Sequence, residues 1–489
     1  MADQSAYRVL YNLDATEFFV GTFGPAVPKT LDDWLDYHVD LGITHLLINV
    51  NAKRTNYRSD VWEADWDGYD PDGGDDQPFF DGLDPQRRFD TNLFKCFYDW
   101  SQSGVEYPSY MLEGARRRGL GAWVSMRMND DHNPDWPDHP CHSTFWKSHP
   151  EWRLNYGLDY EQPEVRRHFM RLLEEICTRF DFDGLELDFQ RFWLYFRPGR
   201  EHLGVALMNE FMEEARAHTR AAAARLGHPV ELAVRVPKSP WIARRHGIDA
   251  AVWGRAGLVD LILASTFWPG MDSDIPIETW KGMLANTDVR VGVALESGIH
   301  SGSKMRVATH EELRAGFVAG LQRGADDIYL FNMFTSPYQT WPREDHDQLI
   351  RDACSFSGLS RGPRRHPLLL TRPWSDGEPG QASDLPYRGD HGIFRLHLGP
   401  LPEEDQIVQV ELVATEKGER PTVSVNGITC PFSGWVEAAH VKRSQGMEEP
   451  RRRAYPVPAA ALSEGYNLIE VRCEMSIEIT WLELAVLPA

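Results

Sequence analysis

The first two-thirds of the chain alternates short apolar runs with amphipathic stretches. The apolar runs have the length of strands, and the stretches between them repeat apolar residues at the helical period. The predicted strands are Tyr7–Asp14, Thr44–Val50, Gly121–Asn129, Asp183–Gln190, Glu231–Pro237, Asp260–Thr266, Arg290–Glu296 and Asp326–Phe334. The predicted helices include Leu31–Leu41, Pro163–Phe180, Leu203–Leu226, Ile277–Asn286 and His310–Arg323. Eight alternations over about 350 residues predict an α/β fold, a (β/α)8 TIM barrel.

Glycines mark the expected ends of several helices. Gly42, Gly119, Gly227 and Gly324 stand where helix C-caps are expected. A doubly wound open sheet would also alternate strands and helices, but no G-x-G-x-x-G follows the first strand. The barrel is therefore the preferred fold, and the open sheet is the alternative.

Two connections in the predicted barrel are far longer than usual. Residues 51–108 follow the second strand and residues 130–162 follow the third, and both are rich in Asp, Gly, Pro and Trp with little periodicity. Loops of this size within a compact domain are normally functional. Both follow the carboxyl ends of strands, where a barrel builds its active site.

The pattern changes after Cys354. Ser355–Pro367 is rich in Gly, Ser, Arg and Pro and is interpreted as a linker or a first loose turn, and short alternating runs of strand type follow it. This predicts a barrel domain of residues 1–357 and a smaller all-β sandwich of residues 358–489. Val423–Gly427 and Gly465–Val471 resemble segments of galactose-binding-type jelly-roll modules. A purely structural domain that supports the barrel is the alternative.

Polar residues alternate with apolar ones in the segment Leu185–Arg191. Its leucines and phenylalanine should face the helices, so Glu186, Asp188 and Gln190 should face the barrel axis, with Glu186 one step deeper. The same alternation and the strand ends place further residues at the mouth: Asn12, Asp14, Asn49, Asn51, Ser125, Arg127, Asn129, Arg235, Trp268, Glu296 and Asn332. Such a polar cup, in place of a packed layer of Val, Ile and Leu, predicts a binding or catalytic site.

Composition excludes some classes of function. The net charge of −22 argues against a nucleic-acid partner, because neutralising phosphates requires a basic surface. No stretch is apolar enough to span a membrane, and the amino terminus lacks the pattern of a signal peptide, so a cytoplasmic location is expected. The six cysteines show no metal-ligand spacing, and neither a cofactor nor a metal is expected. Seventeen Trp and sixteen Tyr residues supply flat rings on which sugars can stack.

Asp188 and Glu296 are the candidate catalytic pair. They end the fourth and seventh predicted strands, so they should face each other across the mouth. Glycosidic bond hydrolysis needs one carboxyl group to protonate the leaving oxygen and another to attack the anomeric carbon or activate water. Nearby arginines would keep one acid ionised while the other holds a proton. A glycoside hydrolase acting on a poly- or oligosaccharide is therefore the preferred function.

The barrel resembles the clan of (β/α)8 glycoside hydrolases whose catalytic acids end strands four and seven. The resemblance implies a retaining mechanism in which Asp188 is the proton donor and Glu296 the nucleophile. The chain departs from the clan in having no Asn-Glu pair on strand four. Asp183, Gly184 and Asp188 also match the chitinase-type pattern D-G-x-D-x-D-x-E, but Gln190 replaces its proton-donating Glu.

Other interpretations remain open. Gln190 motivates a non-catalytic carbohydrate-binding protein with a degenerate barrel site, and a metal-dependent hydrolase or lyase is a third possibility. Asp131 and His132 are candidate substrate ligands or loop anchors, and the acidic run 65–76 is a weak calcium motif. Arg127, Arg191 and Arg235 hint at a carboxylated or sulfated sugar. The sugar, the linkage, the endo or exo mode and the oligomeric state are not predicted.

Overall fold

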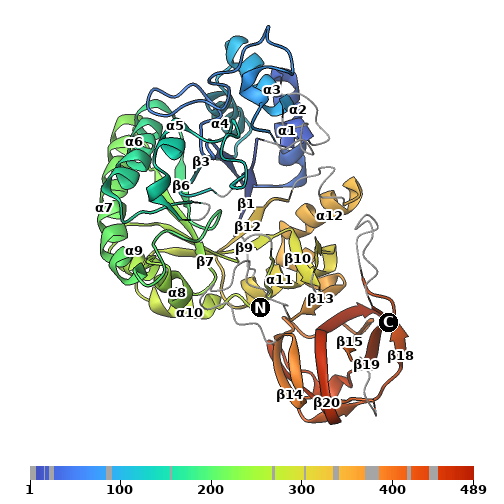
Figure 1. The fold of residues 1–489 in the computed structure, drawn as a ribbon. Coiled ribbons are helices and arrows are strands. Elements are labelled where there is room, and N and C mark those ends of the chain that lie inside the picture. Colours follow the sequence, from blue (N-terminus) through green and yellow to red (C-terminus); the bar gives the residue numbers. More distant parts are fainter. Residues whose placement is uncertain are drawn as a thin grey trace. The chain divides into compact units, whose positions relative to one another are not determined.

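The computed structural model contains a closed eight-stranded barrel of parallel strands and a separate antiparallel sheet (Figure 1). This confirms the predicted fold class. The structure describes residues 7–15, 17–20, 27–83, 91–130, 132–154, 157–266, 270–301, 304–333, 341–368, 385–415, 420–439 and 450–489.

All eight predicted barrel strands are present. Their order around the ring is their order in the sequence, and β12 returns to β1. The strands are β1 (Arg8–Leu13), β2 (His45–Asn49), β3 (Gly121–Arg127), β6 (Gly184–Asp188), β7 (Glu231–Pro237), β8 (Leu261–Ser265), β9 (Arg290–Glu296) and β12 (Asp327–Phe331). β7 and β9 have the predicted bounds, and in β1, β2, β3, β6, β8 and β12 the structure shortens the predicted strand by two to four residues.

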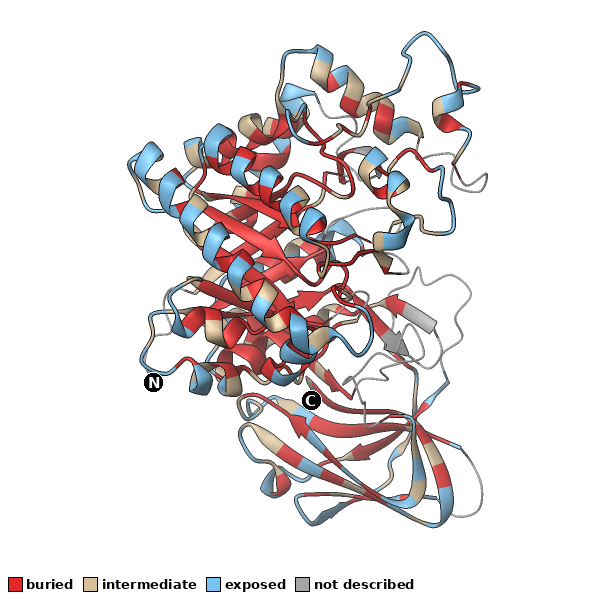
Figure 2. Cartoon of the chain, turned by 60° about the vertical axis from the view of Figure 1, so that its left-hand side comes forward, coloured by how far each residue is buried: buried red, intermediate tan, exposed pale blue. Residues whose placement is uncertain are grey.

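The helices follow the predicted pattern with added short elements. They are α1 (Glu17–Val20), α2 (Pro28–Leu41), α3 (Thr91–Gln102), α4 (Tyr107–Arg117), α5 (Thr144–Ser148), α6 (Pro163–Arg179), α7 (Glu201–Leu226), α8 (Pro240–Arg245), α9 (Ala250–Arg255), α10 (Ile277–Met283), α11 (His310–Gln322), α12 (Arg343–Ala353) and α13 (Phe356–Arg361). Gly42 and Gly227 are the C-caps of α2 and α7 with φ of 98° and 76°, as predicted. Figure 2 shows the barrel strands buried and the outer faces of the helices exposed.

The long connections contain more structure than their composition predicts. Residues 51–108 include the whole of α3, which the sequence analysis treated as part of a loop. Phe94, Phe97 and Trp100 are its buried residues, and their spacing of three is the helical signal that was missed. Residues 130–162 contain α5 and a small hairpin of β4 (Arg153–Leu154) and β5 (Gly157–Leu158).

The antiparallel sheet begins within the segment that was interpreted as a linker. The interpretation of Ser355–Pro367 as a linker is wrong, because this segment forms α13 and β13 (Arg364–Pro367), which pairs with β20 (Tyr466–Pro488). The remaining strands are β14 (Tyr387–His397), β15 (Gln406–Ala414), β16 (Thr422–Val425), β17 (Ile428–Cys430), β18 (Gly434–Val436) and β19 (Arg452–Pro456). A turn at Asn426-Gly427 joins β16 to β17, with positive φ at both residues.

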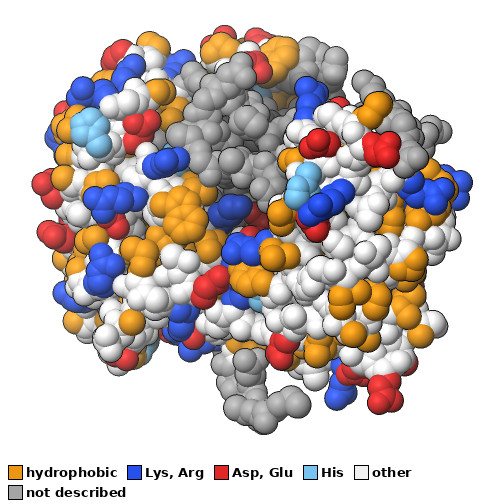
Figure 3. Space-filling model, turned by 90° about the horizontal axis from the view of Figure 1, so that it is seen from below, with side chains coloured by type: hydrophobic (Ala, Val, Ile, Leu, Met, Phe, Trp, Pro, Cys, Tyr) orange, Lys and Arg blue, Asp and Glu red, His pale blue; other side chains and the backbone are white. Residues whose placement is uncertain are grey.

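The chain divides into two compact units. One comprises Arg8–Phe267 and Thr279–Gly292 and holds the first six barrel strands, and the other comprises Met1–Tyr7, Trp268–Glu278 and Val293–Ala489. The predicted domain boundary at residue 357 stays a prediction. Acidic and basic side chains are interspersed on the face drawn in Figure 3. The acidic side chains therefore do not form one continuous cluster on this face, although the net charge of the chain is −22. No helix in the described part of the chain is long and apolar enough to cross a membrane.

The two faces of β6 follow the predicted alternation. The ring of Phe189, which directly follows β6, packs against Trp253 of α9 with centroids 5.7 Å apart, so the apolar side faces the helices. On the other side, Gly184 pairs with Trp123 of β3, and a Cβ atom at Gly184 would lie 2.3 Å from the indole ring. Trp123 therefore fills the lower interior, and glycine is required opposite it.

We expect Gly184→Ala to destabilise the protein by about 1–3 kcal/mol, because the added methyl group overlaps the Trp123 ring. Denaturant unfolding would measure the loss. Gly282→Ala in α10 is the matched control, because nothing lies within 4 Å of a Cβ atom there. The control should be neutral or stabilising by about 0.5–1 kcal/mol. Equal stability of Gly184→Ala and the wild type would contradict the interior position of Trp123.

Candidate active site

Three charged side chains form a row across neighbouring strands. Strand register pairs Arg127 of β3 with Asp188 of β6, and Asp188 with Arg235 of β7. Residues paired in this way share one face of a sheet, and this face is the one that carries Trp123 two steps below. The three residues are 5%, 1% and 1% exposed, respectively. We call Arg127, Asp188 and Arg235 the charged row.

Asp188 accepts hydrogen bonds from three donors. Arg235 donates through Nε to Asp188 Oδ1 and through Nη2 to Oδ2, both at 2.9 Å, and the Gln190 backbone N–H donates to Oδ1 at 2.8 Å. Three donors, one of them a bidentate guanidinium, favour the ionised form of a carboxyl group. These contacts favour a charged role for Asp188, and its predicted role as proton donor stays a prediction. Its predicted position on the inward face agrees with the strand register.

Arg127 links the row to two further acids. Its Nη2 donates to Asp14 Oδ2 at 2.6 Å, and its Nη1 donates to Asp130 Oδ2 at 3.3 Å. Burial alone would lower the pKa of Arg127, but Asp14, Asp130 and Asp188 outweigh burial and raise it. The charge of Arg127 is thus balanced by carboxylates that belong to the chain itself.

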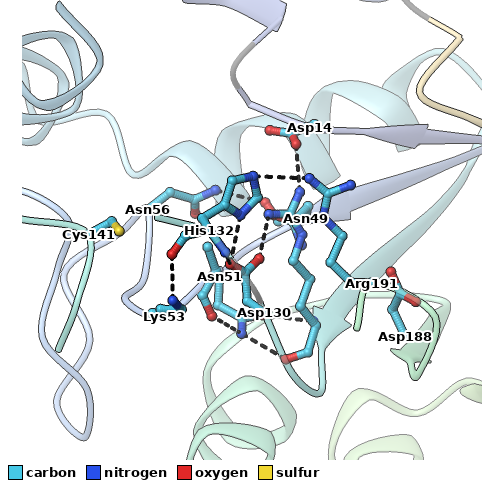
Figure 4. A network of polar contacts seen from close by, with 12 residues as sticks. Asp14, Asn49, Asn51, Lys53, Asn56, Asp130, His132, Cys141, Asp188 and Arg191 are labelled. Carbon is cyan, nitrogen blue, oxygen red and sulfur yellow. Dashed lines mark hydrogen bonds and ion pairs between the residues drawn. The ribbon is translucent and has the colours of Figure 1, made fainter. Parts of the chain in front are cut away.

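His132 and Arg191 continue the network from Asp130 (Figure 4). His132 Nδ1 lies 2.7 Å from Asp130 Oδ1, and Arg191 Nη2 lies 3.1 Å from His132 Nε2. A guanidinium can only donate, so the geometry fits a ring that accepts at Nε2 and donates from Nδ1 to Asp130. Burial would raise the pKa of Asp130, but His132, Arg127 and Arg191 hold it well below its usual value.

Lys53 belongs to the same network and was not predicted from the sequence. Its ammonium group donates to the His132 carbonyl at 2.5 Å and lies 3.2 Å from His142 Nδ1. Burial, with a contribution from Lys53, lowers the pKa of His142 to about 3, so this ring is neutral. Lys53 lies in a non-periodic loop, and nothing in the pattern of the sequence singles it out.

Asn51 and Asn129 support the backbone. The Asn51 amide donates to the Arg127 carbonyl and accepts from the Arg127 N–H, both at 3.0 Å, which extends the ladder between β2 and β3. Asn129 donates to the carbonyls of Leu158 and Leu194 and accepts from the Leu158 N–H. Both amides thus use their donors and acceptors on backbone groups, and their predicted role as substrate ligands stays a prediction.

Polar residues also occupy the layer below the row. Asn12 Nδ2 donates to Ser125 Oγ at 3.2 Å, and Asn49 Nδ2 donates to the Ser125 carbonyl at 3.4 Å. Glu186 pairs in register with Ser125 and is fully buried, one step deeper than Asp188 as predicted. Gln190 donates to the Ser265 carbonyl at 3.0 Å, which ties the end of β6 to β8.

Glu296 ends β9 in an amide-rich setting. It accepts from the Ser297 N–H at 3.0 Å and from Ser297 Oγ at 3.1 Å, and Asn332 Nδ2 lies 3.2 Å from its Oε2. Asn332 follows β12 and has a φ of 52°, in the left-handed region that asparagine tolerates better than most residues. The donors around Glu296 favour its ionised form. Trp268 and Asp131, the other predicted ligands, lie outside the described residues.

Asp65 is a half-buried acid that the sequence analysis considered only as part of a calcium motif. Burial raises its pKa to about 7; Arg54 and Arg127 act against this rise, while Asp130 and Asp14 add to it. Asp65 therefore belongs electrostatically to the cluster around Arg127, although it lies in the loop after β2.

The side-chain amide of Gln77 forms hydrogen bonds with the backbone of the acidic run 65–76. Gln77 Nε2 donates to the carbonyls of Asp70 and Gly74 at 2.8 Å, and its Oε1 accepts from the Asp70 N–H at 2.9 Å. Within the described residues, no group of three or more His, Cys, Asp or Glu side chains is placed to hold a metal ion.

No family model matches the chain, and no curated protein matches it. Among solved structures, it is similar to a cycloisomaltooligosaccharide glucanotransferase from Paenibacillus sp., with 10% identity, a TM-score of 0.35 and coverage of 98% of this chain and 57% of the other. It is also similar to the PgaB glycoside hydrolase domain from Bordetella bronchiseptica, with 12% identity, a TM-score of 0.39 and coverage of 71% and 99%. A third is the GH36 α-galactosidase AgaA from Geobacillus stearothermophilus, with 10% identity, a TM-score of 0.36 and coverage of 97% and 55%. The chain thus spans little more than half the length of the first and third of these proteins.

The Asp188–Arg235 pair can be tested by a double-mutant cycle. We expect Arg235→Met and Asp188→Leu each to cost about 3–5 kcal/mol, because each leaves one buried charge without its partner. The double variant should lose less than either single variant, since it buries no lone charge. Urea unfolding measures all three. Additive losses would contradict the pairing.

The exposed pair Arg388–Glu478 on the antiparallel sheet is the matched control for this cycle. Its side chains are 76% and 30% exposed, so removing either should change stability by about 0–1 kcal/mol.

Proposed function

We propose that the chain is a glycoside hydrolase acting on a poly- or oligosaccharide. The observation that carries this proposal is the charged row at the carboxyl ends of β3, β6 and β7. Burying ions costs several kcal/mol each, and a barrel interior built for stability alone would place Val, Ile or Leu there. Charged and amide groups at this end of a barrel are typical of a catalytic site.

Glu296 is the proposed nucleophile. It lies at the end of β9, the seventh strand of the ring, and its two oxygens accept hydrogen bonds from Ser297 and Asn332. Attack by such a group on the anomeric carbon would give a retaining reaction through a covalent glycosyl-enzyme. The role proposed for Asp188 is electrostatic. Its negative charge, fixed by Arg235, favours the positive charge that develops on the sugar ring in the transition state.

A neutral sugar is the proposed substrate. The sequence hinted at a carboxylated or sulfated sugar because of three arginines, but two of them are neutralised within the chain. Arg235 is paired with Asp188, and Arg127 is paired with Asp14 and Asp130. Recognition by hydroxyl groups and ring faces fits these contacts better than recognition by a free basic patch.

A non-catalytic carbohydrate-binding protein is the second candidate. The observation that favours it is that the contacts of both Asp188 and Glu296 stabilise the ionised form, so neither is suited to donate a proton. Calorimetric binding of an oligosaccharide, with no product released from it on long incubation, would support binding without catalysis.

Glu296→Gln is the direct test of the hydrolase. We expect release of sugars from the best substrate of a glycan panel to fall by more than about 10³-fold, because an amide is a poor nucleophile. The melting temperature should change little, since the amide keeps one acceptor for Asn332. Glu344→Gln, an exposed glutamate at the start of α12, is the matched control and should keep full activity.

Two results would contradict this proposal. A wild-type protein that releases no product from any glycan on the panel would exclude the hydrolase. A fully active Glu296→Gln variant would remove Glu296 from the mechanism.

A further inference from the structure

A cavity with aromatic walls lies between the loop after β2, the helix α3 and the first residue of α4. All of its lining residues belong to the compact unit that holds the first six barrel strands. Five of the lining side chains are aromatic, namely Tyr57, Trp66, Phe97, Trp100 and Tyr107. We call this cavity the aromatic pocket.

The aromatic pocket has room for one ring. Its volume is about 190 Å³, whereas an apolar cavity of about 150 Å³ is large enough to bind benzene. A six-membered ring with a few substituents therefore fits inside. Arg58 and Gly104, which also line the pocket, are exposed, so a ligand can enter from solvent on their side.

The aromatic walls are held in place by packing. The rings of Trp100 and Tyr107 stack with centroids 5.1 Å apart, and Phe97 lies edge to face with Trp100 at 6.3 Å. Trp66 lies 6.4 Å from Phe97, and all four side chains are buried. Flat rings in fixed positions form a preformed surface on which the C–H face of a sugar ring can pack.

Three of the lining residues carry buried polar atoms that have no hydrogen-bond partner within the described part of the chain. They are Asn56 Oδ1, Trp66 Nε1 and Tyr107 Oη. A buried polar atom without a partner costs free energy, so a ligand hydroxyl that reaches one of them would remove that cost. The three atoms are an acceptor, a donor and a hydroxyl that can do both. Groups that donate and accept, such as sugar hydroxyls, complement this set.

The charged residues that line the pocket are already paired within the chain. They are Arg58, which forms an ion pair with Asp67, and Glu106, which forms an ion pair with Arg179. A charged ligand would have to compete with these partners, whereas a neutral ligand would not. The pocket therefore favours a neutral ligand.

The aromatic pocket lies on a loop that begins at the mouth of the barrel. The Asn56 N–H donates to the Val50 carbonyl at 3.1 Å, and Asn56 Nδ2 donates to the Asn49 carbonyl at 2.8 Å. Asn49 is the last residue of β2, and β2 pairs with β3, which ends at Arg127 of the charged row. Asn56 is thus fastened to the carboxyl end of β2 while it forms part of the pocket wall.

We propose that the aromatic pocket binds one neutral pyranose ring and is a sugar-binding subsite in addition to the charged row. The choice of a sugar over another single-ring ligand rests on the proposed glycoside hydrolase function. The apolar face of the sugar packs on the aromatic walls, and its hydroxyl groups exchange hydrogen bonds with Asn56, Trp66 and Tyr107. The pocket binds the sugar without cleaving it, because the acid that lines the pocket, Glu106, is held by Arg179 and Ser109.

Binding can be measured without any reaction. Calorimetry and saturation-transfer NMR would use the methyl pyranosides of glucose, galactose, mannose and N-acetylglucosamine as probes. We expect the wild type to bind at least one of them with a Kd of about 1 mM, the strength typical of a ligand of this size.

Ser101→Leu is the variant that fills the pocket. Ser101 lines the pocket and is half-buried on α3, so a larger side chain there takes up the space of the ligand. We expect this variant to weaken sugar binding by more than about tenfold through steric exclusion. Its melting temperature should stay equal or rise, because filling a cavity with an apolar side chain is stabilising.

Two further variants make the test specific. Gln102→Leu adds the same side chain at the next position of α3, which is exposed and does not line the pocket, so this matched control should bind as the wild type does. Trp66→Phe keeps an aromatic ring and removes the indole N–H. It should weaken binding by about 2–10-fold, the effect of one hydrogen bond.

The outcomes separate the pocket from the hydrolase. A wild type that binds none of the four sugars, or a Ser101→Leu variant that binds them as tightly as the wild type, overturns the pocket. Tighter binding of nicotinamide, a neutral single-ring ligand that is not a sugar, overturns the choice of ligand class. A sugar bound in the pocket, with no cleavage of any glycan on the panel, supports the pocket and overturns the hydrolase alone.

Discussion

The organisation of the site depends on one buried ion pair, between Asp188 and Arg235. Both side chains are 1% exposed, and both oxygens of the carboxylate accept from the same guanidinium at 2.9 Å. The pair holds only if β6 and β7 keep their register, because a slip of one residue in either strand would turn the charge of that strand toward the helices. Because Arg127 stands on the other side of Asp188 in the same row, it is directed to Asp14 and Asp130 instead.

The hydrogen-bond and ion-pair partners of each acid at the mouth of the barrel influence its protonation state. His132, Arg127 and Arg191 hold the pKa of Asp130 well below its usual value, whereas burial raises the pKa of Asp65 to about 7. The surroundings of Asp130 and Asp65 thus shift the pKa values of two aspartates in opposite directions. A two-carboxylate reaction requires such a separation, because one acid has to give a proton while another remains negative.

The sequence predicts the strands and their faces well, because alternation at period two is a local property. The charged row follows directly from the phase of residues 185–190, and the register of β3, β6 and β7 agrees with it. Asp65, Lys53 and the role of Asn129 could not be predicted, because they depend on contacts between a non-periodic loop and a distant strand. The helix α3 was missed although its apolar spacing was present, and the linker interpretation failed because β13 is specified by its partner β20.

The most direct measurement of the central claim is a crystal structure of the protein with an oligosaccharide bound from a mixed library. The account predicts a sugar at the carboxyl ends of β3, β6 and β7. A sugar bound solely to the antiparallel sheet domain, with the end of the charged row in contact with solvent alone, would contradict the account.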